Sequence, residues 1–237
     1  MRMLLIAALL PLAACQSNAE RQGNATEVSG TGATRSFAAS GFTKVDLRGP
    51  DDVDVKTGTN FAVTAEGDSK VLDQLDIRVV DGALRVARKD GNWVGNDRGA
   101  RVHVVMPKLG AATLGGSGDL TIDRAEGDFH AAAAGSGNLT IADLRAGSAD
   151  LSLAGSGDLT VAGSASKLSV SVAGSGDIDA KRLTAASADI SIAGSGNVFG
   201  TVKGPASVSI LGSGDAELGG GAKCSVNALG SGEAHCS

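Results

Sequence analysis

The chain has 237 residues, a formal charge of −5 and a pI near 5.2. Because it also contains no run of Lys or Arg, this charge excludes a basic surface for nucleic acid, and we expect no nucleic-acid partner. Aromatic residues make up 3% of the chain and tyrosine is absent, so the core must consist of Val, Leu, Ile and Ala.

Residues 1–14 are typical of a lipoprotein signal peptide. Met1-Arg2-Met3 is a short basic start, and the apolar run 4–10 is too short to span a bilayer. The segment ending at Cys15, Leu-Ala-Ala-Cys, is similar to the lipobox of bacterial lipoproteins, and this similarity implies cleavage before Cys15 and its acylation. An aspartate after the cysteine retains such proteins in the inner membrane. Because Gln16 stands there, we expect a lipid anchor in the outer membrane, on either of its faces. The alternative is an ordinary secreted protein with a chance cysteine.

Two segments precede the most regular part of the sequence. Residues 15–34 predict a flexible tether, because they are rich in Gly, Ser, Asn and Thr. Residues 35–110 predict a mixed β cap with strands at 45–47, 53–55, 61–63 and 102–106, and a hairpin at 77–86. A helical turn is expected over 69–75 with Ser69 as its N-cap, and residues 88–99 predict a loop.

Residues 111–237 contain seven copies of Gly-Ser-Gly. The copies begin at Gly116, Gly135, Gly155, Gly174, Gly194, Gly212 and Gly230, so they are 19, 20, 19, 20, 18 and 18 residues apart. A period in this range is typical of a solenoid, in which each repeat buries its apolar face only by stacking on its neighbours.

Apolar residues alternate with polar ones on both sides of each Gly-Ser-Gly. Aliphatic residues stand two and four positions before the first glycine and four after it, as Leu153, Leu151 and Leu159 do around Gly155. Each repeat therefore supplies two short strands joined at the glycines, with a second corner near Ala125, Leu144, Leu183 or Val202. The expected fold is all-β: a single-stranded right-handed parallel β-helix with the mixed β cap at its N-terminal end.

Two cysteines remain once Cys15 is assigned to the lipid anchor. Cys224 lies six residues before Gly230 and Cys236 lies six after it, and both offsets belong to inward-facing positions. The alternation therefore places the two thiols on facing walls of the last coil. Since an exported protein enters an oxidising compartment, we expect a disulfide between them, with two separate buried thiols as the alternative.

The sequence resembles the bacterial family described as putative auto-transporter adhesin, head GIN domain. The residues that carry the resemblance are Gly41-Phe-Thr-Lys-Val-Asp-Leu47, Asp52-Val-Asp-Val55, the segment 102–109 and the Gly-Ser-Gly-Asp array that follows. The resemblance covers about residues 37–237. It implies a right-handed β-helical fold and a location in the cell envelope, and little biochemistry beyond the adhesin label.

An acidic or amide residue follows every Gly-Ser-Gly, and its role is open. Stacking would place these side chains in one column of oxygen atoms, so Asp119, Asp158, Asp177 and Asp215 are weak candidates for calcium. The alternative is structural: each side chain accepts a hydrogen bond from a backbone N–H at the turn. Asp158 and Asp177, on adjacent coils, are also the candidate pair of a polysaccharide-degrading enzyme. His103, His130 and His235 lack a metal-binding spacing and are expected on solvent-facing strand positions.

The remaining candidates for function are the flat outer faces. Thr121, Thr140 and Thr160 should form one column, and Ser152, Ser171 and Ser191 another. Phe199 interrupts the threonine column as an exposed apolar residue. The sequence favours a non-enzymatic, lipid-anchored envelope protein that serves as an adhesion or scaffold surface for an envelope polymer or protein, with no cofactor and an undetermined oligomeric state. The alternatives are a polysaccharide-active enzyme and a calcium-dependent binding module.

Overall fold

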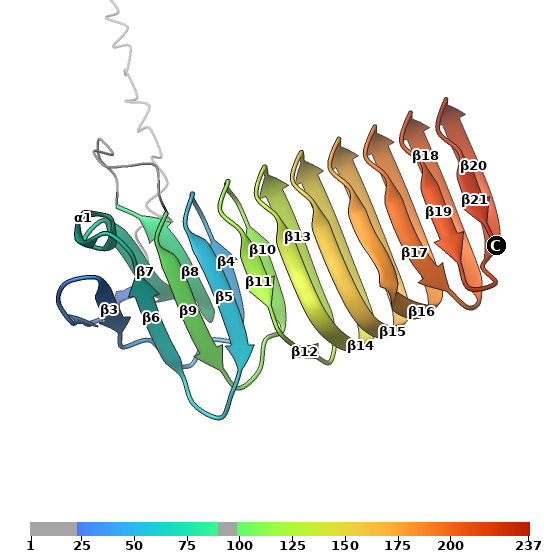
Figure 1. Ribbon diagram of the computed structural model, residues 1–237. Helices are drawn as coiled ribbons and strands as arrows, with labels where there is room; N and C mark the ends of the chain where they lie inside the picture. The colour runs from blue at the N-terminus through green and yellow to red at the C-terminus, as the bar shows by residue number, and fades with distance from the viewer. Residues whose placement is uncertain (1–22, 90–98) are drawn as a thin grey trace, which may run out of the picture.

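The computed structural model describes residues 23–89 and 99–237. The predicted signal peptide, Cys15 and residues 90–98 of the predicted loop lie outside these ranges. The described chain is a parallel β-solenoid with coils stacked in one line, closed at its N-terminal end by a mixed β region (Figure 1). The predicted fold class is confirmed.

Each coil of the solenoid contributes one strand before its Gly-Ser-Gly and one after it. The strands that run up to the glycines are β10 (Ala111–Leu114), β13 (Phe129–Gly135), β18 (Pro205–Gly212) and β20 (Lys223–Gly230). The strands that follow the glycines are β11 (Leu120–Ile122), β17 (Val198–Val202), β19 (Ala216–Gly219) and β21 (Ala234–Cys236). These strands pair in parallel with their counterparts in neighbouring coils.

The second corner lies within continuous strands in three of the coils. The strands β14 (Leu139–Gly155), β15 (Leu159–Gly174) and β16 (Ile178–Gly194) run through it without a break, whereas the first coil has the separate short strand β12 (Ala125–Glu126) there. Register shifts occur at this corner, for example between Ile141 and Leu144. The glycines, in contrast, stay in register from Gly135 to Gly230. The variation in repeat length is therefore absorbed at the second corner.

Parallel stacking begins before residue 111. The strands β4 (Lys44–Leu47) and β5 (Asp52–Thr57) stack under β10 and β11, and β8 (Ala83–Arg88) and β9 (Arg101–Met106) stack under β4 and β5. Gly49 occupies the position of the first repeat glycine, with Leu47 two residues before it and Val53 four after it. These two coils are therefore irregular members of the same stack.

We define the N-terminal cap as the antiparallel part of the structure. It contains β1 (Asn24–Ala25), β2 (Val28–Ser29), β3 (Thr34–Phe37), β6 (Ala62–Glu66), α1 (Ser69–Leu72) and β7 (Leu75–Val80). The predicted tether over 15–34 is therefore wrong from residue 24 on, because β1, β2 and the start of β3 are paired strands of the cap. Strand β6 pairs antiparallel with β9 and β7 pairs antiparallel with β8, which confirms the predicted hairpin. The predicted N-cap Ser69 is wrong: Asp68 caps α1, and its side chain accepts a hydrogen bond from the backbone N–H of Lys70 at 2.8 Å. Asp is as strong an N-cap as Ser, and the helix therefore begins at Ser69, one residue earlier than expected.

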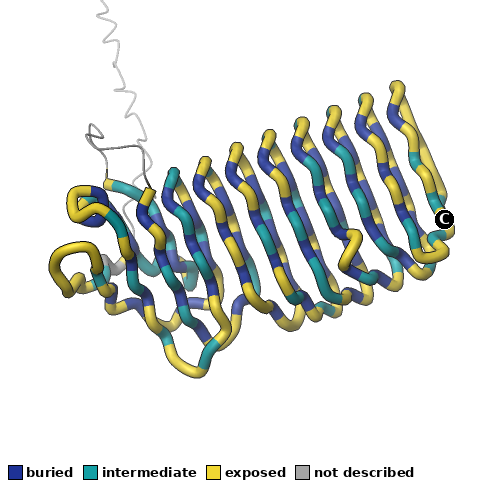
Figure 2. The backbone as a smooth tube through the Cα atoms, in the orientation of Figure 1, coloured by how far each residue is buried: buried dark blue, intermediate teal, exposed yellow. Residues whose placement is uncertain are grey.

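The core is a continuous column of aliphatic side chains between the two walls. Buried and exposed positions alternate along every coil except the last, and the buried positions line up from one coil to the next (Figure 2). Leu139, Leu151 and Leu159, for example, are fully buried. The core thus consists mainly of the aliphatic residue types that the composition predicts, with Phe37, Phe42, Phe129 and Met106 in addition, and the alternation assigns the faces of the regular coils correctly.

The last coil contains the predicted disulfide. Cys224 on β20 and Cys236 on β21 are bonded, with 6.4 Å between their Cα atoms. The bond joins the two walls at the C-terminal end of the stack, which confirms that both offsets face inward.

Candidate functional site: corners, walls and grooves

The Gly-Ser-Gly corners of successive coils touch through their backbones. A Cβ on Gly157 would lie deep inside contact distance of the carbonyl oxygen of Gly137, one coil earlier. Gly155, the first glycine of the same corner, has φ +146, which side chains rarely adopt. Both glycines are therefore required by the stacking, and they leave no room for a ligand between the corners.

The acidic or amide residue after each corner binds the next coil. The Oδ1 atom of this side chain accepts a hydrogen bond from the backbone N–H of the equivalent residue one coil further on, at 2.7–3.1 Å. The column runs through Asp52, Asp119, Asn138, Asp158, Asp177, Asn197 and Asp215 to Glu233. All four calcium candidates, Asp119, Asp158, Asp177 and Asp215, use Oδ1 in this way. This geometry supports the structural alternative, in which the side chain satisfies a backbone N–H at the turn.

Asp158 and Asp177 do not have the different environments that an acid–base pair needs. The backbone N–H of Asp177 donates to Oδ1 of Asp158 at 3.0 Å, and Asp177 accepts from Asn197 in the same manner. Catalytic carboxylate pairs are distinguished by surroundings that hold one protonated and the other ionised. These two carboxylates repeat one arrangement. Among the residues that the structure describes, no group of three or more His, Cys, Asp or Glu is placed to hold a metal ion.

The serine wall is the outer face of the strands that precede the corners. Ser152, Ser171, Ser191 and Ser209 lie in register along it, and the last three are exposed. A groove of about 340 Å³ crosses this wall near the second corner. It is lined by the hydroxyls of Ser187, Ser207 and Ser225 together with Lys167, Asp189 and Lys223. Lys167 Nζ lies 3.0 Å from Asp189 Oδ2.

The threonine wall is the outer face of the strands that follow the corners. Thr121, Thr140 and Thr160 are in register there, and Asp179 and Phe199 continue the column. Phe199 is only partly exposed, because the Lys181 ammonium lies 4.1 Å from its ring centroid. The expectation of an exposed apolar residue is therefore corrected: a cation–π contact covers part of the ring.

The histidines lie on outward-facing positions, as predicted. His103 stands between two carboxylates, with Nδ1 3.4 Å from Asp54 and Nε2 3.1 Å from Glu66. His130 lies 3.3 Å from Asp150, and His235 lies 3.4 Å from Glu233. Each histidine thus lies beside at least one carboxylate on the surface, and the three histidines lie on different coils.

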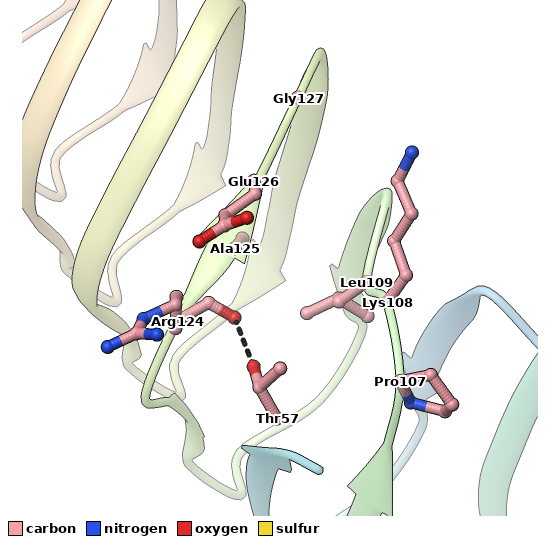
Figure 3. Close-up of a pocket in the computed structure, with 8 residues that line it drawn as sticks. All are labelled: Thr57, Pro107, Lys108, Leu109, Arg124, Ala125, Glu126 and Gly127. Atoms are coloured by element: carbon pink, nitrogen blue, oxygen red, sulfur yellow. Dashed lines mark hydrogen bonds between the residues drawn. The ribbon is translucent and has the colours of Figure 1, made fainter. Parts of the chain in front are cut away.

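A second groove, of about 380 Å³, lies where the irregular coils meet the first regular coil (Figure 3). Leu109 and Ala125 form its apolar floor, and Lys108, Arg124 and Glu126 stand at its rim. The Thr57 hydroxyl donates to the carbonyl oxygen of Arg124 at 3.1 Å and ties the two sides together. Sequence reasoning missed this groove, because its walls come from three segments that have no shared motif.

One family model matches most of the chain. The sequence model of the family described as "Putative auto-transporter adhesin, head GIN domain" matches residues 41–222. No curated protein matches the chain.

Solved structures are similar to the chain at low sequence identity. A putative adhesin from Bacteroides fragilis is 20% identical with a TM-score of 0.81, over 86% of this chain and 96% of that one. A putative lipid binding protein from Parabacteroides distasonis is 22% identical with a TM-score of 0.68, over 86% and 96%. A putative adhesin from Parabacteroides merdae is 17% identical with a TM-score of 0.69, over 86% and 95%. At these identities the likeness establishes the shared fold. Within the described residues, no helix has the length and apolar character needed to cross a membrane.

Proposed function

Because the chain belongs to the head GIN domain family of putative auto-transporter adhesins, we propose that it is a non-enzymatic adhesion or scaffold protein whose serine wall binds an envelope polymer. Membership of this family indicates a protein of the cell envelope or surface. We further propose that acylated Cys15 anchors it in the outer membrane and that residues 16–22 link the lipid to the cap, whose first strand is β1.

The observation that carries this proposal is the composition of the serine wall. Its hydroxyl column is regular from Ser152 to Ser209, and the groove beside it is lined by three serines, two lysines and Asp189, together with three apolar residues. Hydroxyl groups both donate and accept hydrogen bonds, so a row of them suits a polymer that presents sugar hydroxyls at a regular spacing. The ammonium group of Lys223 adds a site for a carboxylate or phosphate substituent, whereas Lys167 is already paired with Asp189. The acidic column, in contrast, already uses its Oδ1 atoms within the fold.

The wall assignment is tested with matched variants on the two walls. The double substitution Ser171→Lys with Ser191→Lys should weaken binding to an array of purified envelope polysaccharides by on the order of tenfold, because long side chains would cover the hydroxyl column. The control is Thr140→Lys with Thr160→Lys, which alters the opposite wall to the same extent. Equal losses in the two variants, or no loss in either, would count against the serine wall.

The anchor is tested separately. Mass spectrometry of the chain purified from envelopes should find a diacylglyceryl group on Cys15 and no residue before it. Replacing Cys15 by Ser should release the chain from the outer-membrane fraction. A chain that stays in this fraction after the substitution has another means of attachment.

A further inference from the structure

The two ends of the solenoid differ in what covers them. At the N-terminal end, β8 and β9 pair antiparallel with β7 and β6 of the cap, and β1 and β3 extend this cover (Figure 1). At the C-terminal end, β20 and β21 form the last coil, and no strand in the described ranges pairs with their outer edges. An uncovered parallel edge offers unpaired backbone groups to another chain.

The last coil exposes side chains that are core residues in every other coil. Val226 is 48% exposed, whereas Val208, its partner one coil earlier, is 1% exposed. Ala228 is likewise exposed, whereas its partner Ile210 is buried. Beside them, Leu211 and Leu229 stack in register and are 61% and 65% exposed. The end of the stack is therefore an apolar surface.

The free edge of β20 has a defined pattern of hydrogen-bonding groups. The backbone N–H of Lys223 donates to the carbonyl oxygen of Gly204, so the N–H and C=O groups of Lys223, Ser225 and Asn227 face β18. Those of Cys224, Val226 and Ala228 consequently face away from the stack. The disulfide between Cys224 and Cys236 joins this strand to the opposite wall and holds the edge in a fixed shape.

We propose that the C-terminal coils of two copies of this chain pair about a two-fold axis, with β20 antiparallel to β20. In this register Val226 lies opposite Val226, and Cys224 lies opposite Ala228. All three residues then exchange backbone hydrogen bonds, because antiparallel hydrogen-bonded pairs recur at every second residue. The inward-facing side chains of the two last coils meet, and the two cores become continuous.

A second copy fits this edge for two reasons. The N-terminal end of another copy is covered by the cap, so a head-to-tail stack is blocked and the free end of a copy is its own C-terminal coil. The charge pattern is also compatible with self-pairing: Lys223 is the one charged residue of β20, and it falls opposite Leu229, while Ser225 falls opposite Asn227. No like charges face each other on this strand pair, and a two-fold interface closes after two copies.

The pairing has a consequence for adhesion, which rests on the proposed function. The first described strand, β1, belongs to the cap, so two copies paired through their C-terminal coils have their β1 strands at opposite ends of the dimer, and the proposed anchors precede these strands. Copies on two neighbouring cells could then join the cells. The pairing itself does not depend on the anchor or on the serine wall.

The test is native mass spectrometry of the full chain released from detergent micelles, over a range of concentrations. The wild-type chain should be a dimer. Val226→Lys should raise the dissociation constant by about a hundredfold or more, because two ammonium groups would be brought together at an apolar contact. Val28→Lys, at a 58% exposed valine of the cap, is the matched control and should leave the dimer intact. Circular dichroism should show unchanged strand content in both variants.

The register is tested by a charge pair at the rim. Leu229→Lys places a second cation opposite Lys223 and should weaken the dimer relative to the wild-type chain. Leu229→Glu places an anion opposite Lys223 and should leave the dimer intact. A monomeric wild-type chain, an intact dimer in Val226→Lys, or equal effects of the two Leu229 variants would each overturn the proposal.

Discussion

The cap and the regular coils are stabilised in different ways. In the regular coils the same contacts recur. Two glycines at each corner touch the backbone of the coil before, one carboxylate or amide oxygen accepts a hydrogen bond from a backbone N–H of the next coil, and aliphatic residues pack at fixed offsets. The irregular coils share part of this set, as at Asp52, but they and the cap also use contacts that occur once, such as the Asp51–Arg88 ion pair and the Asp68 N-cap of α1. From this difference we expect each regular coil to contribute a similar share of the stability, whereas the stability of the N-terminal region depends on a few individual residues.

We expect the largest loss of stability from a single substitution at Asp51. Its carboxylate is 1% exposed, accepts two hydrogen bonds from Arg88 at 2.7 and 2.8 Å, and accepts a third from the backbone N–H of Ala100 at 2.7 Å. Asp51→Ala removes one partner of a largely buried guanidinium and the acceptor of the Ala100 N–H, and it should lower the free energy of unfolding by about 3 kcal/mol, measured by chemical denaturation. A loss below about 1 kcal/mol, as for exposed ion pairs, would mean that the irregular coils do not depend on this contact.

In the regular coils the most sensitive positions should be the glycines. Gly157→Ala forces the backbone of one corner away from that of the coil before it and should lower the free energy of unfolding by about 3 kcal/mol. The matched control is Gly219→Ala, because a Cβ on Gly219 meets no atom within 4 Å. Similar melting temperatures of the two variants would show that the corners are not in tight contact.

Breaking the disulfide should have an intermediate effect confined to the last coil. Cys224 and Cys236 are 12 residues apart in sequence. A bond that closes a loop of this length contributes about 3 kcal/mol in the chain-entropy view. The double variant Cys224→Ala with Cys236→Ala should therefore speed amide hydrogen exchange in 223–236, while exchange in β14 stays slow. Uniformly faster exchange along all coils would contradict this local role.

The acidic column should give the smallest effects. Asp158→Ala leaves the backbone N–H of Asp177 without its acceptor and should lower the free energy of unfolding by about 1 kcal/mol. Asp158→Asn keeps an oxygen in the same place, as Asn138 and Asn197 do in their coils, and should be close to neutral. Adding a chelator should leave the melting temperature of the wild-type chain unchanged. A drop on chelation that is lost in Asp158→Asn would support the calcium alternative.

The repeats were predictable from the sequence because each position is supported by seven copies. The alternation around Gly155 and its equivalents identified the inward-facing residues, and with them the facing positions of Cys224 and Cys236. The irregular coil at Gly49 follows the same offsets but was missed, because Asp51 stands where the repeats have their second glycine. The cap and the groove at Thr57 and Arg124 could not be predicted, since they depend on contacts between segments that carry no common pattern.

The register shifts at the second corner have a consequence for how such a molecule changes over evolutionary time. Since the glycine corners stay aligned while coils differ in length, a residue can be gained or lost at the second corner without disturbing the rest of the stack. Whole coils can be duplicated or deleted in the same way, and each would lengthen or shorten the rod by about 4.8 Å. The reach of the protein from its capped end can therefore be adjusted in small fixed steps, with both ends left unchanged.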